Sequence, residues 1–325
     1  MRELTIGKND AGQRLDRFVA KSVPLLPPAL LQKYIRIKRI KVNGGASRRD
    51  TRLSEGDTLQ LYINDEFFDE REGKNLFLSL WHPRVRIVYE DENILLADKR
   101  PGQPVHADET EKVNTLITHI QAYLYQKGEW KPEEENAFTP ALCNRIDRNT
   151  SGLVIAAKNA EALRIVNEKI RSHEIEKSYL CVTVGHPRPP EGKIEGFLLK
   201  DERKKQVTFH RRPVPGGRSA VTLYRTLAEE GELSLVECRL LTGRTHQIRV
   251  SLAELGCPLL GDGKYGNGAA NRRYQEAWQA LSACKLRFAF PTDAGILQYL
   301  RGKTFAVERV AFQEKYFPHS GKNQS

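Results

Sequence analysis

Residues 144–157 read NRIDRNTSGLVIAA, and this stretch joins a dense polar segment to a short apolar run. The apolar residues 153–157 have the length and composition of a buried strand. The polar segment places Arg145, Asp147 and Thr150 at the start of that strand, where loops hold catalytic groups. An isolated aspartate in such a loop most often accepts backbone hydrogen bonds in a turn. The role of Asp147 therefore depends on the other segments.

Strands and helices alternate around this stretch. Residues 86–99 predict two strands joined by a turn. Asn159 is expected to cap a helix over 160–171, because its apolar residues share one face. Further strands are predicted at 178–184 and 233–241. The larger part of the chain is thus expected to consist mainly of strands with intervening helices.

Two further segments place polar or aromatic side chains beside predicted strands. Residues 242–249 read TGRTHQIR, and Thr245 is expected to cap a helix that stops at Gly256. Arg249 would lie one turn inside this helix, where an arginine is more often a surface ion-pair partner than a site residue. Tyr179 lies near the start of a predicted strand, and a lone tyrosine there usually belongs to the core.

The sequence GDGKYG at residues 261–266 satisfies the pattern G-x-G-x-x-G of dinucleotide-binding loops. That pattern needs a preceding strand and an acidic residue at the end of the next strand, whereas Pro258 stands three residues upstream and no such acid is evident. Lys264 is followed by a tyrosine, so the loop is not a phosphate-binding P-loop either. We therefore expect no nucleotide cofactor here.

Positive charge is concentrated near the N-terminus. The 325 residues include 52 Lys or Arg and 41 Asp or Glu, and the net charge of +11 favours a polyanionic partner. Residues 33–52 carry eight bases against one acid, and on charge alone this window fits an RNA-binding surface and a solvated helix face equally well. Its bases are Lys33, Arg36, Lys38, Arg39, Lys41, Arg48, Arg49 and Arg52. A second basic group at 200–218 is predicted to decorate a hairpin with its tip at 213–217, either gripping phosphates or protecting an edge.

The composition disfavours several protein classes. No apolar run approaches the roughly 18 residues of a membrane helix. The N-terminus has no apolar signal core, so we expect a soluble, cytoplasmic protein. The five cysteines are odd in number and lie at least 19 residues apart, which disfavours a zinc site and a disulfide framework.

The N-terminal part predicts a small αβ module. A helix begins at Leu15, prolines interrupt the chain at 24–28, and a second helix follows. Strand-like residues occur at 40–42 and 59–63, and the acidic residues from 65 onward are typical of a solvated linker. We divide the chain into a module at 12–64, a linker at 65–79, a larger domain at 80–317 and a polar tail at 318–325.

The polar segments together resemble the RluA-type pseudouridine synthases. The pattern R-I-D-x-x-T-S-G at 145–152 resembles the central motif of that family, K-x-Y at 177–179 its second motif and GRTHQIR at 243–249 its third. Residues 256–266 match the stretch that follows, and residues 99–106 resemble an early K-P-x-G-x-x-V-H segment. The resemblance covers about 80–315 and implies an α+β fold with a central mixed, mostly antiparallel sheet and flanking helices.

The N-terminal module resembles the S-four type RNA-binding domain, which is often fused to these synthases. The patterns G-x-R-L-D at 12–16, I-x-V-N-G at 40–44 and L-x-x-G-D at 53–57 carry this resemblance. Two positions depart from it, because prolines begin the second helix and Lys38 replaces the usual glycine. In the larger domain, Asn144 and Ser251 stand where the synthases often have histidine.

The resemblance implies roles for five residues. Asp147 would be the catalytic carboxylate, and attack on the sugar and removal of a sugar proton are both open. Arg249 would orient Asp147 and favour its charged form. Arg145 would fill the place vacated by a flipped uridine, Tyr179 would stack on the uracil and is a candidate general base, and Ile248 would line the pocket.

The resemblance also implies a substrate and partners. It predicts an isomerase that needs neither cofactor nor metal and binds structured RNA. We also expect a monomer. Ribosomal RNA of the large subunit is the favoured substrate, because family members with this N-terminal domain often act there. Transfer RNA is the alternative substrate, and a non-catalytic RNA-binding factor on the same fold is the alternative function.

Overall fold

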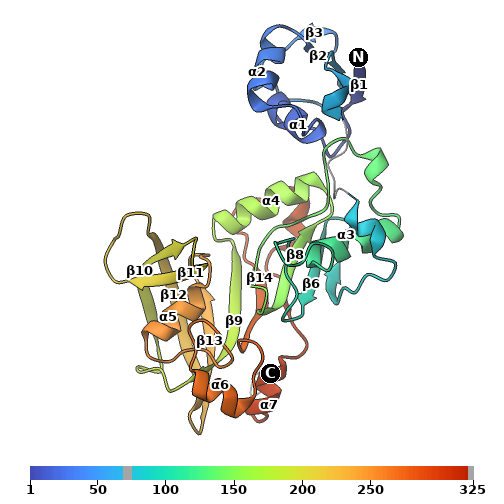
Figure 1. The fold of residues 1–325 in the computed structure, drawn as a ribbon. Coiled ribbons are helices and arrows are strands. Elements are labelled where there is room, and N and C mark those ends of the chain that lie inside the picture. Colours follow the sequence, from blue (N-terminus) through green and yellow to red (C-terminus); the bar gives the residue numbers. More distant parts are fainter. Residues whose placement is uncertain (69–74, 321–325) are drawn as a thin grey trace.

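The computed structural model describes residues 1–68 and 75–320, which form a small N-terminal module and a larger domain (Figure 1). The module contains helices α1 (Leu15–Ser22) and α2 (Pro28–Arg36) and strands β1 (Arg2–Thr5), β2 (Ile40–Val42), β3 (Gly45–Ala46) and β4 (Thr58–Leu61). Its sheet has the order β1-β4-β2-β3. Buried side chains such as Phe18 and Leu59 form a core of the module's own.

Three details of the module differ from the sequence prediction or refine it. Strand β1 lies before the predicted boundary at residue 12, yet it pairs along its length with β4. Lys38 has a φ of 62°, which explains why a glycine usually stands there. Residues 65–68 form a 3₁₀ turn whose Phe67 and Phe68 pack against the module core, so this part of the predicted linker is not simply solvated. The predicted linker at 69–74 and tail at 321–325 lie outside the described residues.

The described part of the larger domain is built on an 11-stranded sheet with the main path β11-β10-β12-β13-β9-β14-β8-β6-β5. Strands β8 and β14 pair in parallel and the other described pairs are antiparallel, which confirms the predicted mixed sheet. Its strands are β5 (Ile87–Glu90), β6 (Ile94–Lys99), β7 (Ala141–Leu142), β8 (Ser151–Ala157), β9 (Ile175–Val184), β10 (Glu191–Asp201), β11 (Gln206–His210), β12 (Arg218–Glu230), β13 (Leu233–Leu240), β14 (Leu281–Phe288) and β15 (Thr304–Ala306).

Helices flank this sheet, as predicted. They are α3 (Leu116–Gln126), α4 (Ala160–Arg171), α5 (Gln247–Glu254), α6 (Gly268–Tyr274) and α7 (Ala311–Tyr316), with 3₁₀ turns at Leu76–Ser79, Pro132–Glu134 and Gly295–Leu300. Asn159 caps α4 as expected, because its side chain accepts a hydrogen bond from the Ala162 amide at 2.8 Å. Among the described residues, no helix is long and apolar enough to cross a membrane.

Two local predictions in this domain were wrong. Helix α5 begins at Gln247 and its N-cap is His246, which has a φ of 54°, so Thr245 does not cap it. The turn of the basic hairpin lies at 202–205, between β10 and β11, and not at 213–217. Residues 213–217 instead belong to the connection from β11 to β12, because β12 pairs with the opposite edge of β10.

The module is fixed to the larger domain at the start of α4 (Figure 1). The Ala160 amide, which is the first of this helix, donates to Asn9 Oδ1 at 3.1 Å. Arg164 donates to the backbone oxygen of Ala11 at 3.1 Å. The segment after the 3₁₀ turn at Pro132–Glu134 adds hydrogen bonds from Asn136 to Thr5 and Asp10, and Asn9 donates a hydrogen bond to Glu135. These contacts give the module a defined place on the domain.

Candidate active site

A cleft of about 1380 Å³ runs between the two halves of the large sheet. Its walls come from the loop before β8, the start of β9, the segment leading into α5 and the glycine-rich loop after it. All five residues predicted to form the site line this cleft: Arg145, Asp147, Tyr179, Ile248 and Arg249. Segments that are up to 104 residues apart in the chain, 145 to 249, are therefore brought together.

Strand β8 fixes the position of the Asp147 loop. The Thr150 amide donates to the Asp147 backbone oxygen at 3.0 Å, and Gln279 Nε2 donates to Thr150 Oγ1 at 3.1 Å. Gly152 has a φ of 108°, and a Cβ there would overlap the backbone of Ala283 on the neighbouring strand β14. Only glycine therefore allows the loop to pass this close to β14.

Asn144 holds the other end of this loop. Its Oδ1 accepts a hydrogen bond from the Ile155 amide at 2.8 Å, and its Nδ2 donates to the Leu153 oxygen at 3.4 Å. Asparagine, in the position where the synthases often have histidine, thus forms hydrogen bonds with two backbone groups of β8. Ser251, at the other departure, is buried, and its hydroxyl has no hydrogen-bond partner among the described residues.

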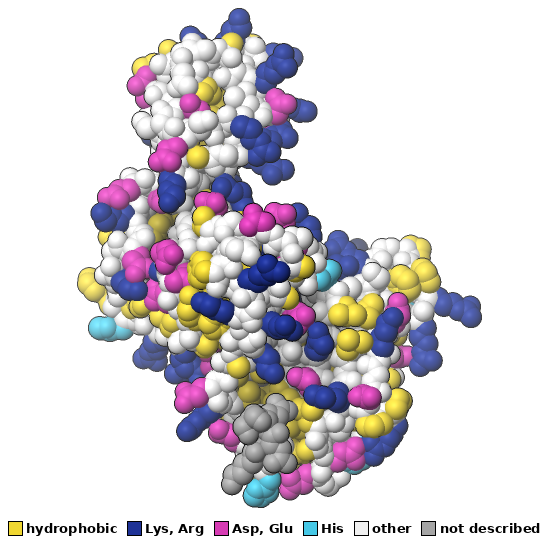
Figure 2. All heavy atoms as spheres, turned by 180° about the vertical axis from the view of Figure 1, so that it is seen from behind, with side chains coloured by type: hydrophobic (Ala, Val, Ile, Leu, Met, Phe, Trp, Pro, Cys, Tyr) yellow, Lys and Arg dark blue, Asp and Glu magenta, His cyan; other side chains and the backbone are white. Residues whose placement is uncertain are grey.

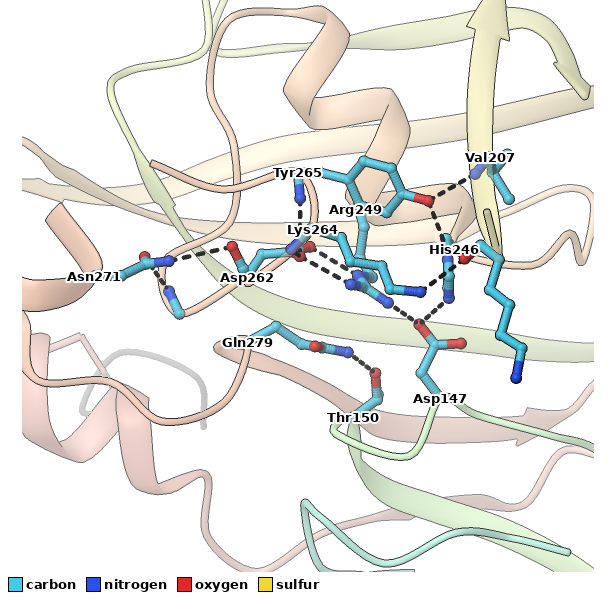
Figure 3. Close-up of polar contacts among 12 residues, drawn as sticks. Asp147, Thr150, Val207, His246, Arg249, Asp262, Lys264, Tyr265, Asn271 and Gln279 are labelled. Atoms are coloured by element: carbon cyan, nitrogen blue, oxygen red, sulfur yellow. Dashed lines mark hydrogen bonds and ion pairs between the residues drawn. The ribbon is translucent and has the colours of Figure 1, made fainter. Parts of the chain in front are cut away.

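Arg249 lies between two carboxylates (Figure 3). Its Nη1 donates to Asp147 Oδ2 at 2.9 Å, while Nε and Nη2 donate to Asp262 at 2.7 and 2.8 Å. The side chain of Asp147 is 25% exposed toward the cleft, whereas that of Asp262 is fully buried. Burial opposes the charge on Arg249, but the contacts with Asp262 and Asp147 outweigh it and raise its pKa. The guanidinium therefore stays charged beside Asp147.

Tyr179 lies on β9 and is buried against the cleft. Burial first, and then the negative charge of Asp147, raise the pKa of its hydroxyl. Tyr179 is therefore a neutral phenol at neutral pH, and its ring forms an aromatic part of the cleft wall. A neutral phenol is a weak proton acceptor, so its surroundings do not favour the role of general base.

Arg145 contrasts with Arg249. Its side chain is exposed and makes no hydrogen bond or ion pair with the part of the chain that the structure describes. His106, on the facing loop, also lines the cleft, and burial together with the charge of Arg145 lowers its pKa. The Arg145 guanidinium is thus free to contact a group bound in the cleft.

A histidine and a tyrosine that sequence reasoning left without roles complete the site (Figure 3). Tyr265 Oη accepts a hydrogen bond from the Val207 amide at 2.9 Å and lies 2.8 Å from His246 Nδ1. The two groups share this hydrogen bond, and in the tautomer in which Tyr265 donates to Nδ1 a neutral His246 carries its own proton on Nε2. This nitrogen lies 3.9 Å from Asp147 Oδ2. Burial lowers the pKa of His246, which favours the neutral imidazole.

Lys99 supports the same loop from below the cleft. It is fully buried, and its Nζ donates to the backbone oxygens of Arg100, Gln103 and Arg148, each at 2.8 Å. Burial lowers the pKa of Lys99 to about 7. The early K-P-x-G-like segment is thereby tied to the residue that follows Asp147.

The basic residues of the module form a second surface. Lys33, Arg36, Lys38, Arg48 and Arg49 line one groove of about 580 Å³ between α2 and the loop after β3. Arg39 and Lys41 instead lie over aromatic rings, 4.6 Å from the ring centre of Tyr34 and 5.4 Å from that of Tyr62. Lys and Arg side chains gather along one flank of the module in Figure 2.

The arrangement can perform acid–base or nucleophilic chemistry on a group held in the cleft. Asp147 supplies the carboxylate, Arg249 a fixed cation, and Tyr179 and Ile248 an aromatic and an aliphatic wall. Among residues 1–68 and 75–320, no cluster of His, Cys, Asp and Glu side chains could hold a metal ion.

Known proteins share this sequence and fold. Residues 93–254 match the family described as RNA pseudouridylate synthase. The Uncharacterized RNA pseudouridine synthase YhcT of Bacillus subtilis is 31% identical over 294 residues, which are 89% of each chain. Ribosomal large subunit pseudouridine synthase C of Rickettsia bellii is 30% identical over 268 residues, or 78% of this chain and 83% of that protein. The structure of Human RNA Pseudouridylate Synthase Domain Containing 4 has a TM-score of 0.55 and 24% identity over 77% of this chain and 95% of that one.

The geometry of the cleft shows which kinds of chemistry are possible, and the sequence relatives identify the family to which that chemistry belongs. The structural match supports the fold. The chain belongs to the RNA pseudouridylate synthase family and is an isomerase that acts on RNA.

Proposed function

We propose that this enzyme converts specific uridines of large-subunit ribosomal RNA to pseudouridine through Asp147. One observation carries the proposal: a carboxylate that is 25% exposed to the cleft is held by a buried arginine. The reaction breaks the bond from the sugar to N1 of uracil and forms a bond from the same carbon to C5. Asp147 either attacks that carbon or removes a sugar proton, and its place at the cleft wall serves both routes.

The other residues handle the flipped nucleotide. Extruding a base costs a few kcal/mol, which stacking and filling of the vacated place offset. Tyr179 would stack on the uracil and Ile248 would line the apolar side of the pocket, because both are buried side chains that line the cleft. Arg145 would occupy the vacated place, because its exposed guanidinium has no partner among the described residues.

The N-terminal module would hold RNA beside the target uridine. Five Lys and Arg side chains line one groove, and each one that contacts an RNA phosphate releases counterions. The relative from Rickettsia bellii, which is named for the large ribosomal subunit, supports ribosomal RNA over transfer RNA as the substrate. We propose that the enzyme acts as a monomer, and a ribosomal RNA substrate supports a cytoplasmic location.

The proposal is tested by replacing Asp147 with Asn in the full chain. Tritium release from RNA labelled at C5 of uridine should stop, while RNA binding stays within about threefold of the wild type. Undiminished release by this variant would refute the role of Asp147.

The substrate is tested by mapping pseudouridine in total cellular RNA with and without the gene. Loss of a site in large-subunit ribosomal RNA, restored by the wild-type gene and not by the Asp147→Asn gene, is expected. Loss of a site in transfer RNA alone would refute the ribosomal assignment. No lost site anywhere would favour a non-catalytic RNA-binding factor.

A further inference from the structure

We propose that Asp262 is a positioning residue that fixes Arg249 for its contact with Asp147, and that the glycine-rich loop 261–266 is built to hold it. This inference rests on the roles proposed for Asp147 and Arg249. It also gives a purpose to the glycine pattern that no nucleotide explains. Asp262 has a fully buried side chain and does not line the cleft, so it acts through Arg249 and not on RNA.

Asp262 uses both carboxylate oxygens on Arg249. Its Oδ2 accepts from Nε at 2.7 Å and its Oδ1 from Nη2 at 2.8 Å (Figure 3). Such a two-point contact with a planar guanidinium fixes its orientation, which a single contact does not. The remaining nitrogen, Nη1, then points at Asp147. The direction of this nitrogen is thus set from behind the cleft.

The loop itself holds the carboxylate of Asp262 in place. Its Oδ1 also accepts the backbone amides of Lys264 and Tyr265, at 2.8 and 3.1 Å. Asn271 on α6 donates to the Asp262 backbone oxygen at 3.1 Å and accepts the Gly261 amide at 2.7 Å. Every one of these contacts restrains Asp262 before any substrate is bound.

The glycines make this loop sterically possible. A Cβ at Gly261 would overlap the backbone of Trp278, and the residue has a φ of 77°. A Cβ at Gly266 would overlap the backbone oxygen of Asp262. Both positions therefore exclude side chains because the chain folds tightly around Asp262, which accounts for two of the three glycines without a bound phosphate.

Asp262 also competes with Asp147 for hydrogen bonds from Arg249. Two carboxylates share one guanidinium, and the buried one takes two of its three contacts. Asp147 therefore keeps a single contact and remains accessible to the sugar, instead of being closed into a two-point ion pair of its own. Without Asp262, the fork of Arg249 would be free to turn toward Asp147 and block it.

The test compares Asp262→Asn with Glu174→Gln in the full chain. Asparagine keeps an oxygen for the two loop amides but sets an NH₂ group against the guanidinium. Glu174 is a matched control, because it is a buried carboxylate that pairs with Lys169 at 2.7 Å and does not line the cleft. A misplacement of about 1 Å costs roughly 100-fold in rate, so we expect Asp262→Asn to lower the single-turnover rate constant by about that factor. RNA affinity should stay within threefold, and Glu174→Gln should keep the wild-type rate.

Two further variants separate positioning from general loss of structure. If Asp262 acts through Arg249, adding Asp262→Asn to Arg249→Lys should lower the rate by less than threefold, because the geometry is already lost. Asn271→Ala, which loosens the loop and keeps the carboxylate, should give a rate loss smaller than that of Asp262→Asn at an unchanged RNA affinity.

A rate for Asp262→Asn within threefold of the wild type would overturn the proposal. So would an additional 100-fold loss in the Arg249→Lys background, or an unchanged rate for Asn271→Ala if Asp262→Asn does not fold. These outcomes are independent of the Asp147→Asn result, which tests the proposed function itself.

Discussion

Replacement of Arg249 by lysine removes the fork while keeping the charge. Arginine makes three contacts, at 2.7, 2.8 and 2.9 Å, and a lysine ammonium at this position can replace only part of them. The ammonium should stay with Asp262, because an unpaired carboxylate that is fully buried costs more than one that is partly exposed. Asp147 then loses its one charge-assisted hydrogen bond.

The size of the effect follows from that single contact. A hydrogen bond to a charged group contributes about 1.5–3 kcal/mol. If this orientation is needed fully in the transition state, the loss corresponds to a roughly 10- to 160-fold slower chemical step. The fall should appear in the rate constant and leave RNA affinity nearly unchanged, because the Arg249 side chain is largely buried and its three hydrogen bonds go to Asp147 and Asp262.

Single-turnover tritium release at saturating enzyme measures the chemical step directly. Filter binding with the same RNA measures affinity. Arg225→Lys is a matched control, because Arg225 forms an exposed ion pair with Glu237 at 3.2 Å outside the cleft. An Arg249→Lys rate within threefold of the wild type, or a loss confined to affinity, would refute the proposed orientation of Asp147.

Two further predictions concern RNA affinity and acid stability. Changing Lys33, Arg36, Arg48 and Arg49 together to Gln should reduce the slope of log affinity against log salt by roughly 3 to 4 if each meets a phosphate, without changing the chemical step; an unchanged slope would mean that the groove does not hold RNA. The hydrogen bond from Lys169, followed by those from Ser172 and Thr292, lowers the pKa of Glu174 from an ordinary 4.5 to about 2. The ionised Glu174 carboxylate therefore stabilises the fold above pH 4.5, and this stabilisation is lost as the pH falls through about 2. The difference in urea midpoint between the wild type and Glu174→Gln should therefore shrink between pH 4.5 and pH 2, and a constant difference would contradict this assignment.

The sequence predicted those features whose causes are local. Strand β8 and helix α4 follow from an apolar run and from the cap at Asn159, both of which act within a few residues. The predicted cap at Thr245 was wrong because His246 adopts a left-handed backbone conformation and is itself the N-cap of α5. No local sequence pattern predicts this conformation. Strand β1 was not predicted because its pairing with β4 joins residues nearly 60 positions apart.

The chemistry of the site was only partly visible in the sequence. The motifs named Asp147, Tyr179 and Arg249, and the cleft brings them together. The contacts of Asp262 and Tyr265 depend on the folding of a loop against α5 and β11, so no spacing rule could assign them. The signal that was available was the glycine pattern at 261–266, whose tight packing marks a loop that must present one side chain accurately.

Helix α4 links the N-terminal module to the cleft mechanically. Its first amide is capped by Asn9 of the module, and its last residues, Ile170 and Arg171, line the cleft. Twelve residues at about 1.5 Å each give a strut of roughly 18 Å. Under the proposed function, an RNA that contacts both the module and the cleft must match this fixed span as well as present a uridine, so helix α4 would set which RNA shapes the enzyme accepts.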